Sequence, residues 1–320
     1  MWRYIAKRIL WMIPVIIGIS LIVFLLLNIA PGDPAQLILG GEATEESLEA
    51  LKEEMGLNDP PMQQYFRYMK NFLKGDLGVS YRNQIDVKEQ LLQKLPNTLI
   101  LAFAATLFMI VVGIPVGVIS AKKQYSVLDN ITMVGTLIGA SAPGFWFALV
   151  FVIIFSLNLK WFPSSGMGSG FGPMLKSLVL PAITLGINNM ALVARMTRSS
   201  MLEVMREDYI STARAKGISE RAVTWKHMLR NALLPIVTVV GARFGVLLGG
   251  SIAIETVFAW PGVGNYVIAA VNARDMPATM GSVLVLSIVF SFVNLIVDIL
   301  YAYIDPRIKA QYIRKGGTRK

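Results

Sequence analysis

The sequence predicts an all-α integral membrane protein with six transmembrane helices and a small extracytoplasmic domain after the first helix. Three observations support this fold class. Of the 320 residues, 54% are hydrophobic and 16% are charged, and the mean hydropathy of +0.57 is higher than soluble domains show. Uncharged stretches long enough to cross a bilayer recur, since a spanning helix needs roughly 20 apolar residues. Basic residues are concentrated in alternate connections, as they are in multi-pass proteins.

Four predicted spans carry no charge, and they cover residues 9–30, 95–121, 130–159 and 177–194. The first is longer than the apolar core of a cleaved signal peptide and is not followed by a small-residue cleavage site, so we expect it to remain as an anchor. The fifth span, at 232–258, contains Arg243, and the sixth, at 279–304, contains Asp298 near its far end. Each of the six is expected to cross the membrane once.

The connecting segments assign the two sides of the membrane, because basic flanks stay in the cytoplasm. Residues 195–230 hold eight Lys and Arg, and residues 307–320 hold six, whereas residues 31–94 hold eleven acids against seven bases. Both termini are therefore expected on the cytoplasmic side of a cytoplasmic (inner) membrane. The net charge of +10 is mainly a topology signal. It does not indicate nucleic-acid binding, because the basic residues flank apolar helices rather than gather with aromatics on one face.

The chain is expected to divide into four parts. They are a cytoplasmic N-terminus with the first helix at 1–30, an extracytoplasmic domain at 31–94, a five-helix core at 95–304 and a basic cytoplasmic tail at 305–320. Within the outer domain, Thr44 can cap one helix, and Pro60 and Pro61 suit the start of a second, which carries an apolar stripe. This stripe packs on the domain itself or on the membrane surface, or else it helps to dock an external partner.

The cytoplasmic loop at 195–231 is the most informative segment, because it is long and has the pattern of two helices around Gly217. Ala213, Ala215 and Gly217 are small, so the surface of another protein can approach the backbone there. Ser219 can cap the helix that follows. The loop is therefore predicted to be a docking element.

At residues 212–217 the loop reads T-A-R-A-K-G. It resembles the E-A-A…G loop of ABC-importer permease subunits, which inserts a short coupling helix into the ATP-binding subunit. Thr212 stands where the general form has Glu, and Leu234 and Pro235 lie farther from Gly217 than in sugar permeases. The variant is similar to the dipeptide, oligopeptide and nickel branch. Further segments resembling that branch are A-P-G-D-P at 30–34, G-D-L-G at 75–78, L-P-N-T-L at 95–99, W-F-P at 161–163, R-M-T-R-S-S-M-L-E-V at 195–204, E-T-V-F-A-W-P-G-V-G at 255–264, R-D-M-P at 274–277 and D-P-R-I at 305–308.

Together these segments resemble the first permease of the pair, the one that bears the outer domain. The resemblance implies the type I ABC-importer permease architecture and a heterodimer with a second permease. It also implies two ATP-binding subunits, an extracytoplasmic solute-binding protein and a short-peptide substrate, with nickel chelates, glutathione or another small solute as the alternatives. The residues expected to couple to the ATPase are Asp208, Tyr209, Thr212, Ala213, Arg214, Ala215, Lys216 and Gly217.

The chain itself is expected to be no enzyme. It contains no G-x-x-x-x-G-K-S/T loop to cradle nucleotide phosphates, so ATP and Mg2+ are expected on the partner subunits and no cofactor on this chain. No catalytic residue and no metal site is predicted, since the chain has no cysteine and a single histidine, His227, expected at the surface. A proton- or sodium-driven secondary transporter is the rival class, although Asp298 alone is thin support for an ion relay.

Polar or helix-breaking residues inside the predicted spans are the candidates for the translocation path. Arg243 either lines or gates the path, where it can meet a peptide carboxylate, or forms a structural ion pair for which Asp298 is the first choice. Pro143 and Gly144 predict a kink beside a cavity within the third span. The full candidate set is Ser141, Phe145, Trp146, Asn188, Asn189, Arg243 and Asp298. For the two asparagines, bonding to a neighbouring helix and facing the path are both open.

Overall fold

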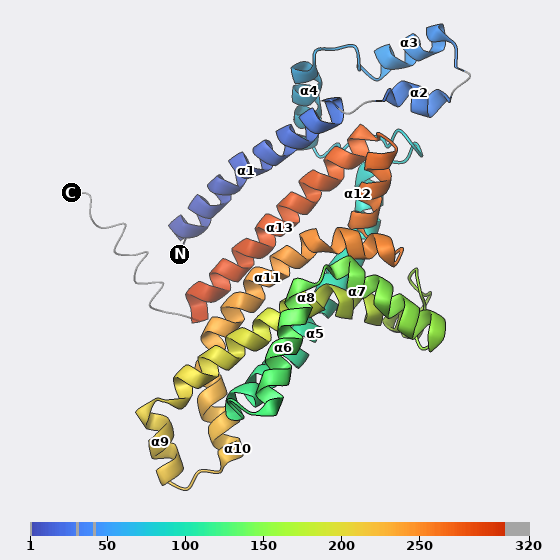
Figure 1. Ribbon diagram of the computed structural model, residues 1–320. Coiled ribbons are helices and arrows are strands. Elements are labelled where there is room, and N and C mark those ends of the chain that lie inside the picture. Colours follow the sequence, from blue (N-terminus) through green and yellow to red (C-terminus); the bar gives the residue numbers. More distant parts are fainter. Residues whose placement is uncertain (1, 30–31, 41–42, 305–320) are drawn as a thin grey trace, which may run out of the picture. The chain divides into compact units, whose positions relative to one another are not determined.

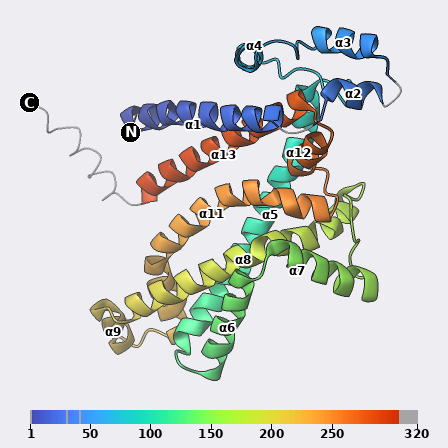
Figure 2. The ribbon, with the colours of Figure 1, turned by 45° about the horizontal axis from the view of Figure 1, so that its top comes forward.

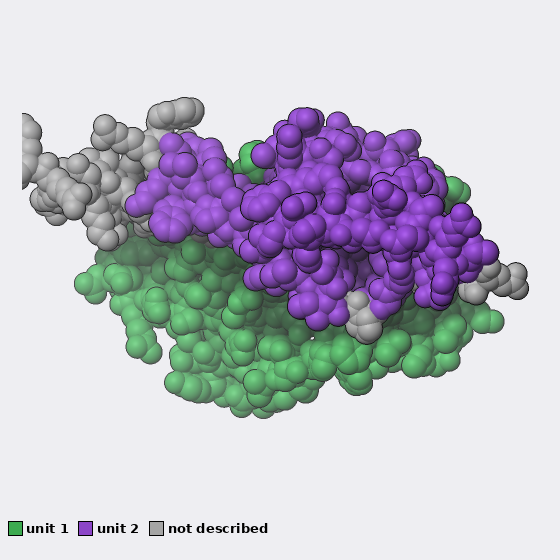
Figure 3. Space-filling model, turned by 90° about the horizontal axis from the view of Figure 1, so that it is seen from above, with its two compact units in different colours: residues 1, 99–260, 292–320 green, residues 2–98, 261–291 purple. Residues whose placement is uncertain are grey.

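The computed structural model describes residues 2–29, 32–40 and 43–304. The predicted basic tail at 305–320, with its D-P-R-I segment, lies outside these residues. Apart from one isolated β-bridge between Val79 and Asp86, the regular structure of the described chain is helical, which confirms the all-α prediction. The chain forms two compact units, coloured separately in Figure 3. Of the described residues, unit 1 contains 99–260 and 292–304, and unit 2 contains 2–98 and 261–291.

Five helices are long and apolar enough to cross a membrane. They are α1 (Trp2–Ile29), α5 (Val87–Lys122), α8 (Phe171–Met205), α11 (Leu229–Val257) and α13 (Met276–Ile304). The sixth candidate is a bent pair, in which α6 (Val127–Ser141) is followed at 104° by α7 (Gly144–Phe151) and the π-helical segment η1 (Val152–Asn158). The described chain therefore offers five spans, or six when the bent pair counts as one.

The bend lies at the predicted Pro143–Gly144 kink, in unit 1 (Figure 1). Ala142 is extended, with ψ near 140°, and Pro143 follows in an extended conformation with φ −61° and ψ 139°. A proline ring clashes with a helical residue before it, so the helix ends at Ser141. The third predicted span is thus two helical pieces rather than one continuous helix.

Helix α8 is the central element of unit 1, where it packs against α6, α7 and α11 (Figure 2). It also approaches α5 closely. A Cβ atom at Gly117 would lie 2.4 Å from the carbonyl oxygen of Ala194 and 2.5 Å from Cβ of Thr197. Only glycine at this position allows the two backbones to come so near. Helix α8 is therefore held on several sides within its unit.

Unit 2 contains the segment that the sequence predicts on the outer side, here called the outer segment, with α2 (Pro34–Leu39), α3 (Glu45–Glu54) and α4 (Pro61–Leu73). It also contains the short helix α12 (Val263–Asn272). The predicted cap is present, because the Thr44 hydroxyl accepts a hydrogen bond from the Ser47 N–H at 3.3 Å. The apolar stripe of α4 is split between two environments. Tyr65 is buried against Phe24 of α1, and its hydroxyl lies 2.8 Å from that of Ser20, whereas Phe66 stays 64% exposed.

A buried carboxylate fixes the loop between α4 and α5 within unit 2. Asp275 is 1% exposed and accepts hydrogen bonds from the Ser80 hydroxyl and from the Arg82 and Ala278 N–H groups. Burial, with the nearby Asp275 charge as the second cause, raises the pKa of Tyr81 to about 12. These bonds tie the R-D-M-P segment to the loop of residues 75–86, so two motifs far apart in the sequence share one structural role.

Candidate functional site

Residues 195–205 of the predicted docking loop at 195–231 belong to α8, so the loop starts later than the sequence indicates. The residues after α8 form a helical hairpin, here called the α9–η2 hairpin, that leads into α11. It consists of α9 (Asp208–Ala215), α10 (Glu220–Ala222) and the π-helical segment η2 (Val223–Met228). The predicted cap is again present, since Ser219 accepts a hydrogen bond from the Ala222 N–H. The pattern of two helices around Gly217 is confirmed.

One face of the hairpin is buried against the rest of unit 1. Ile210 is 0% exposed and Ala213 is 7% exposed, and both belong to an apolar cluster with Met201 of α8 and Val223 and Met228 of η2. The small size of Ala213 therefore serves packing inside the hairpin. The other seven residues predicted to couple to an ATPase are exposed: Asp208, Tyr209, Thr212, Arg214, Ala215, Lys216 and Gly217.

The turn after α9 depends on glycine. Gly217 has φ +76°, a left-handed conformation in which a side chain is strained, and no atom lies within 4 Å of the position a Cβ would take. Its N–H donates to the Arg214 carbonyl at 2.9 Å and the Ile218 N–H donates to the Ala213 carbonyl at 3.3 Å, which closes the helix end. Arg214 also pairs with Glu220 across the turn at 2.8 Å. The tip of the hairpin is thus ordered, exposed and open to an approaching surface.

Two further side chains shape the exposed face of the hairpin. Trp225 on η2 is 48% exposed and was not singled out by the sequence, although exposed aromatic residues are typical of protein interfaces. Partial burial, followed by the negative charge of Glu207, raises the pKa of Tyr209. His227 lies on the same segment and is partly exposed, and its carbonyl accepts a hydrogen bond from Asn231.

Of the predicted path residues, the structure brings those of α8 and the α6–α7 break together. The Asn188 side chain donates a hydrogen bond to the Ala142 carbonyl at 3.0 Å, so this asparagine bonds to a neighbouring helix. The Ala142 carbonyl is available because the chain is extended at Ala142, and the Trp146 N–H at the start of the next helix bonds to the Pro143 carbonyl instead. Ser141, Phe145 and Trp146 lie on either side of this contact and are exposed, the two aromatics at 53% and 48%.

Arg243 lies near the middle of α11 and is partly exposed. Among the described residues it makes no hydrogen bond or ion pair, so the pairing with Asp298 left open by the sequence is absent there. Asn189 of α8 is likewise partly exposed and without a hydrogen-bond partner in the described chain. A guanidinium without a partner at this depth is costly in lipid and is expected to face water or another charged group.

Asn188, Asn189 and Arg243 lie at similar depth, as the packing of α8 on α11 indicates. The two helices run in opposite directions, because one enters the hairpin and the other leaves it. Leu185 lies 3.9 Å from the Cβ position of Gly250. Counting seven residues back along α11 to Arg243 and about as many forward along α8 places Arg243 within about one helical turn of the two asparagines. Together with the break at Ala142, they form what we call the polar layer: Ser141, Ala142, Asn188, Asn189 and Arg243.

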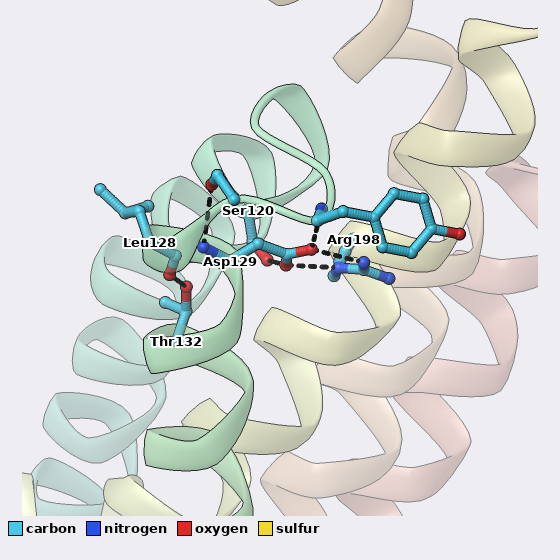
Figure 4. A network of polar contacts seen from close by, with 7 residues as sticks. Ser120, Leu128, Asp129, Thr132 and Arg198 are labelled. Atoms are coloured by element: carbon cyan, nitrogen blue, oxygen red, sulfur yellow. Dashed lines mark hydrogen bonds and ion pairs between the residues drawn. The ribbon is translucent and has the colours of Figure 1, made fainter.

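The sequence missed one charged pair altogether. Asp129, at the start of α6, is 2% exposed, and it accepts hydrogen bonds from Nε and Nη2 of Arg198 on α8 at 2.8 and 2.7 Å (Figure 4). The Ser120 hydroxyl of α5 and the Tyr125 N–H also donate to this carboxylate. In the sequence both charges look like ordinary flanks of apolar helices. Their pairing joins residues 69 positions apart, and no periodic pattern reveals it.

Two family descriptions match the chain. Residues 113–310 match the binding-protein-dependent transport system inner membrane component, and residues 1–102 match the N-terminal part of binding-protein-dependent transport system membrane components. The Dipeptide transport system permease protein DppB of Alkalihalophilus pseudofirmus is 43% identical, over 97% of this chain and 100% of its own. The Oligopeptide transport system permease protein AppB of Bacillus subtilis is 40% identical over the same shares. The Glutathione transport system permease protein GsiC of Escherichia coli is 39% identical, over 97% of this chain and 99% of its own.

Solved structures show a similar fold at lower sequence identity. A chain of the MetNI methionine ABC transporter, in inward-facing conformations, aligns with a TM-score of 0.55 and 21% identity. The alignment covers 67% of this chain and 96% of that chain. At this identity the likeness concerns the fold alone.

Proposed function

The chain belongs to the family of binding-protein-dependent transport system inner membrane components, and from this premise we propose that it forms half of the translocation pathway of an ATP-driven importer of short peptides. The observation that carries the proposal is the match along almost the whole chain to permease proteins of dipeptide and oligopeptide transport systems. The proposed assembly contains a second permease, two ATP-binding subunits that hold ATP and Mg2+, and an extracytoplasmic solute-binding protein.

The α9–η2 hairpin is proposed to receive the ATPase. Its tip carries exposed Arg214, Lys216 and Gly217, while its opposite face is buried through Ile210 and Ala213. A force applied to the tip is therefore resisted by packed side chains rather than absorbed by a loose loop. Closure of the ATPase pair would move this hairpin and shift the permeases between inward-open and outward-open states.

The polar layer is proposed to border the path of the peptide, with Phe145, Trp146 and Asp298 as the further candidates. Support comes from Arg243, whose guanidinium has no partner among the described residues. A water-filled path removes the cost of placing this charge at mid-membrane depth, and a peptide carboxylate is a good ligand for it. The proposed location is a cytoplasmic (inner) membrane with both termini in the cytoplasm, supported by the distribution of basic residues.

A second candidate substrate is glutathione or another small solute handled by the same machinery. A relative named as a glutathione transport permease is 39% identical over 97% of this chain, close to the identity of the oligopeptide relative. Competition between a dipeptide, a longer peptide and glutathione for uptake by the assembled importer separates these candidates.

The experiment that tests the function replaces Gly217 by Trp in the complete complex, reconstituted in liposomes with its loaded binding protein. The bulky side chain should block the approach of the ATPase to the hairpin tip. We expect ATP-dependent peptide uptake to fall by at least about tenfold, a coupling loss within the usual allosteric range, while the chain still inserts and folds.

Gly75→Trp is the matched control, because Gly75 also ends a helix with positive φ, at +84°, and a Cβ there would also meet no atom within 4 Å. The two variants therefore carry a similar backbone strain, but Gly75 lies in the outer segment. Uptake that survives Gly217→Trp unaltered would remove the docking role of the hairpin. Uptake by the lone chain without ATPase subunits would contradict the importer as a whole.

A further inference from the structure

The Asp129–Arg198 pair joins three helices at one point of unit 1. Asp129 lies in the first turn of α6, Arg198 near the end of α8, and Ser120 near the end of α5 (Figure 4). Both carboxylate oxygens are used, because Oδ1 accepts from Arg198 Nε and Ser120, and Oδ2 accepts from Arg198 Nη2 and the Tyr125 N–H. Such a two-pronged arrangement fixes orientation as well as distance.

The pair lies close to the hairpin. Arg198 precedes the end of α8 by seven residues, which is about 10 Å of helix. Next to it, Thr197 packs on Gly117 of α5, where a Cβ atom would lie only 2.5 Å from the Thr197 Cβ. The segment of α8 that enters the hairpin is thus held to α5 by packing and to α6 by charge.

A second contact between α6 and α8 lies at the other end of α6. There the Asn188 side chain bonds to the carbonyl of Ala142, directly after the last residue of the helix. The two contacts are ten residues apart on α8, about 15 Å, and thirteen apart on the chain of α6, about 20 Å. With both ends fixed, α6 has to follow α8 when α8 moves.

An ion pair is an expensive way to hold two helices together. The desolvation penalty of the two charges cancels much of the free energy gained from their attraction. Apolar residues of similar volume often stabilise such a site as well or better. What the charges add is a unique relative position of the two helices, since the bonds form in one geometry only. The choice of Asp and Arg here is therefore better explained by positioning than by stability.

We propose that Asp129 and Arg198 are positioning residues for transport, and that their ion pair makes α6 move with α8 so that displacement of the α9–η2 hairpin reaches the α6–α7 break. This inference rests on the proposed function. The break is where the exposed Ser141, Phe145 and Trp146 border the polar layer. The pair is proposed to act through the helices that it joins.

The test measures peptide transported per ATP hydrolysed in the complete, reconstituted complex. Arg198→Gln removes the charge but leaves Asp129 bonded to Ser120 and Tyr125, so the carboxylate is not orphaned. We expect this ratio to fall by about tenfold, a change typical of lost coupling between sites, with ATP hydrolysis still running. Asp129→Asn should act in the same way. The double variant should be no worse than either single one, because the two residues work as a unit.

Arg67→Gln is the control, since Arg67 also pairs with an aspartate, Asp59, but in the outer segment. Its transport ratio should equal that of the native complex. An unchanged ratio in assembled Arg198→Gln, or additive effects in the double variant, would overturn the proposal. If Arg198→Gln does not assemble, Arg198→Lys decides, because it keeps the charge without the two-pronged bond. Its ratio should fall by less than tenfold, and an unchanged ratio, or a failure of this variant to assemble too, would assign the pair to folding alone.

A second readout follows the break directly. The chain has no cysteine, so Ser141→Cys supplies the single thiol of this subunit. Its reaction rate with a water-soluble thiol reagent should differ between nucleotide-free and ATP-bound complexes, and Arg198→Gln should abolish that difference. A difference that persists in Arg198→Gln argues against the pair. Gly217→Trp in the same assays separates the two proposals: if it uncouples while Arg198→Gln does not, only the inference fails.

Discussion

Two short helices outside the apolar spans, α9 in the hairpin and α3 in the outer segment, look alike in sequence and differ in how they are held. Each begins with an acidic first turn and is followed shortly by a glycine with positive φ, Gly217 or Gly56. Helix α3 buries none of its residues. Helix α9 buries Ile210 and Ala213 in the apolar cluster of unit 1.

The difference teaches which of the two helices can transmit a force. A helix of 8 to 10 residues is marginal by itself in water, so tertiary packing decides whether it is rigid. Helix α9 is an extension of the core, and a push on its tip reaches α8. Helix α3 depends on its cap and on surface pairs such as Lys52–Asp33, so it is expected to open locally more often.

The largest effect should come from removing the anchor of α9. Ile210→Ala leaves a cavity in a fully buried position and should cost about 2–5 kcal/mol of unfolding free energy. Leu51→Ala, at a partly exposed site of α3, should cost less than about 1 kcal/mol. Denaturant unfolding of the purified chain in mixed micelles gives both values. Equal costs would mean that the two helices are anchored alike.

An intermediate effect should come from the helix caps, which are similar in the outer segment and in the α9–η2 hairpin. Thr44→Ala and Ser219→Ala each remove a hydroxyl that accepts a backbone N–H, normally worth about 1 kcal/mol. In Thr44→Ala, amide hydrogen exchange should become about fivefold faster throughout α3, because losing about 1 kcal/mol of cap stabilisation raises the population of the open helix by about that factor. In the second, the buried Val223 and Thr224 should confine the rise to α10. A rise that spreads through η2 would weaken the contrast.

The smallest effect should be a response of the outer segment to acid. The Lys52 ammonium, 2.7 Å away, holds the pKa of Asp33 below its ordinary value. A lowered pKa in the folded state means that the pair stabilises the segment above the ordinary value of 3.8, and that this is lost as the pH falls through the lowered pKa. At neutral pH, amide exchange in α2 and α3 should be slower in the native protein than in Asp33→Asn. The two exchange rates should become equal at low pH. Exchange in the α9–η2 hairpin should not distinguish the two proteins at any pH.

Much of the secondary structure was predictable because its signals are local. Apolar stretches, two of them interrupted by a single charge, marked five long helices. The hydroxyls of Thr44 and Ser219 marked two helix starts, and Pro143 marked the bend. The starting point of α5 was less visible. The sequence places that span at 95–121, but the helix begins at Val87, because the charged stretch 87–94 has no breaking residue and Pro96 is accommodated within the helix.

The candidate sites were predictable only in part. Seven of the eight residues expected at the docking surface are exposed, but whether Ala213 faced outward or inward depended on the helix face that packs on unit 1. Asn188 could have bonded or faced the path, and its bond to Ala142 exists because the bend frees that carbonyl. Two roles for Arg243 were open from the sequence, lining the path or forming a structural ion pair, and the absence of a partner in the described chain favours the first.

The sequence by itself determined the membrane-spanning class, the kink, the hairpin with its exposed glycine and the family, since hydrophobic length, caps, breakers and motifs are properties of neighbouring residues. Only the tertiary structure decided which charges meet. Asp129 and Arg198 lie in different helices, and each looks like a flank until α6 packs on α8 and removes the carboxylate from water. Burial makes the pairing obligatory, because the free-energy penalty of an unpaired buried carboxylate would exceed the stabilisation gained when α6 packs on α8.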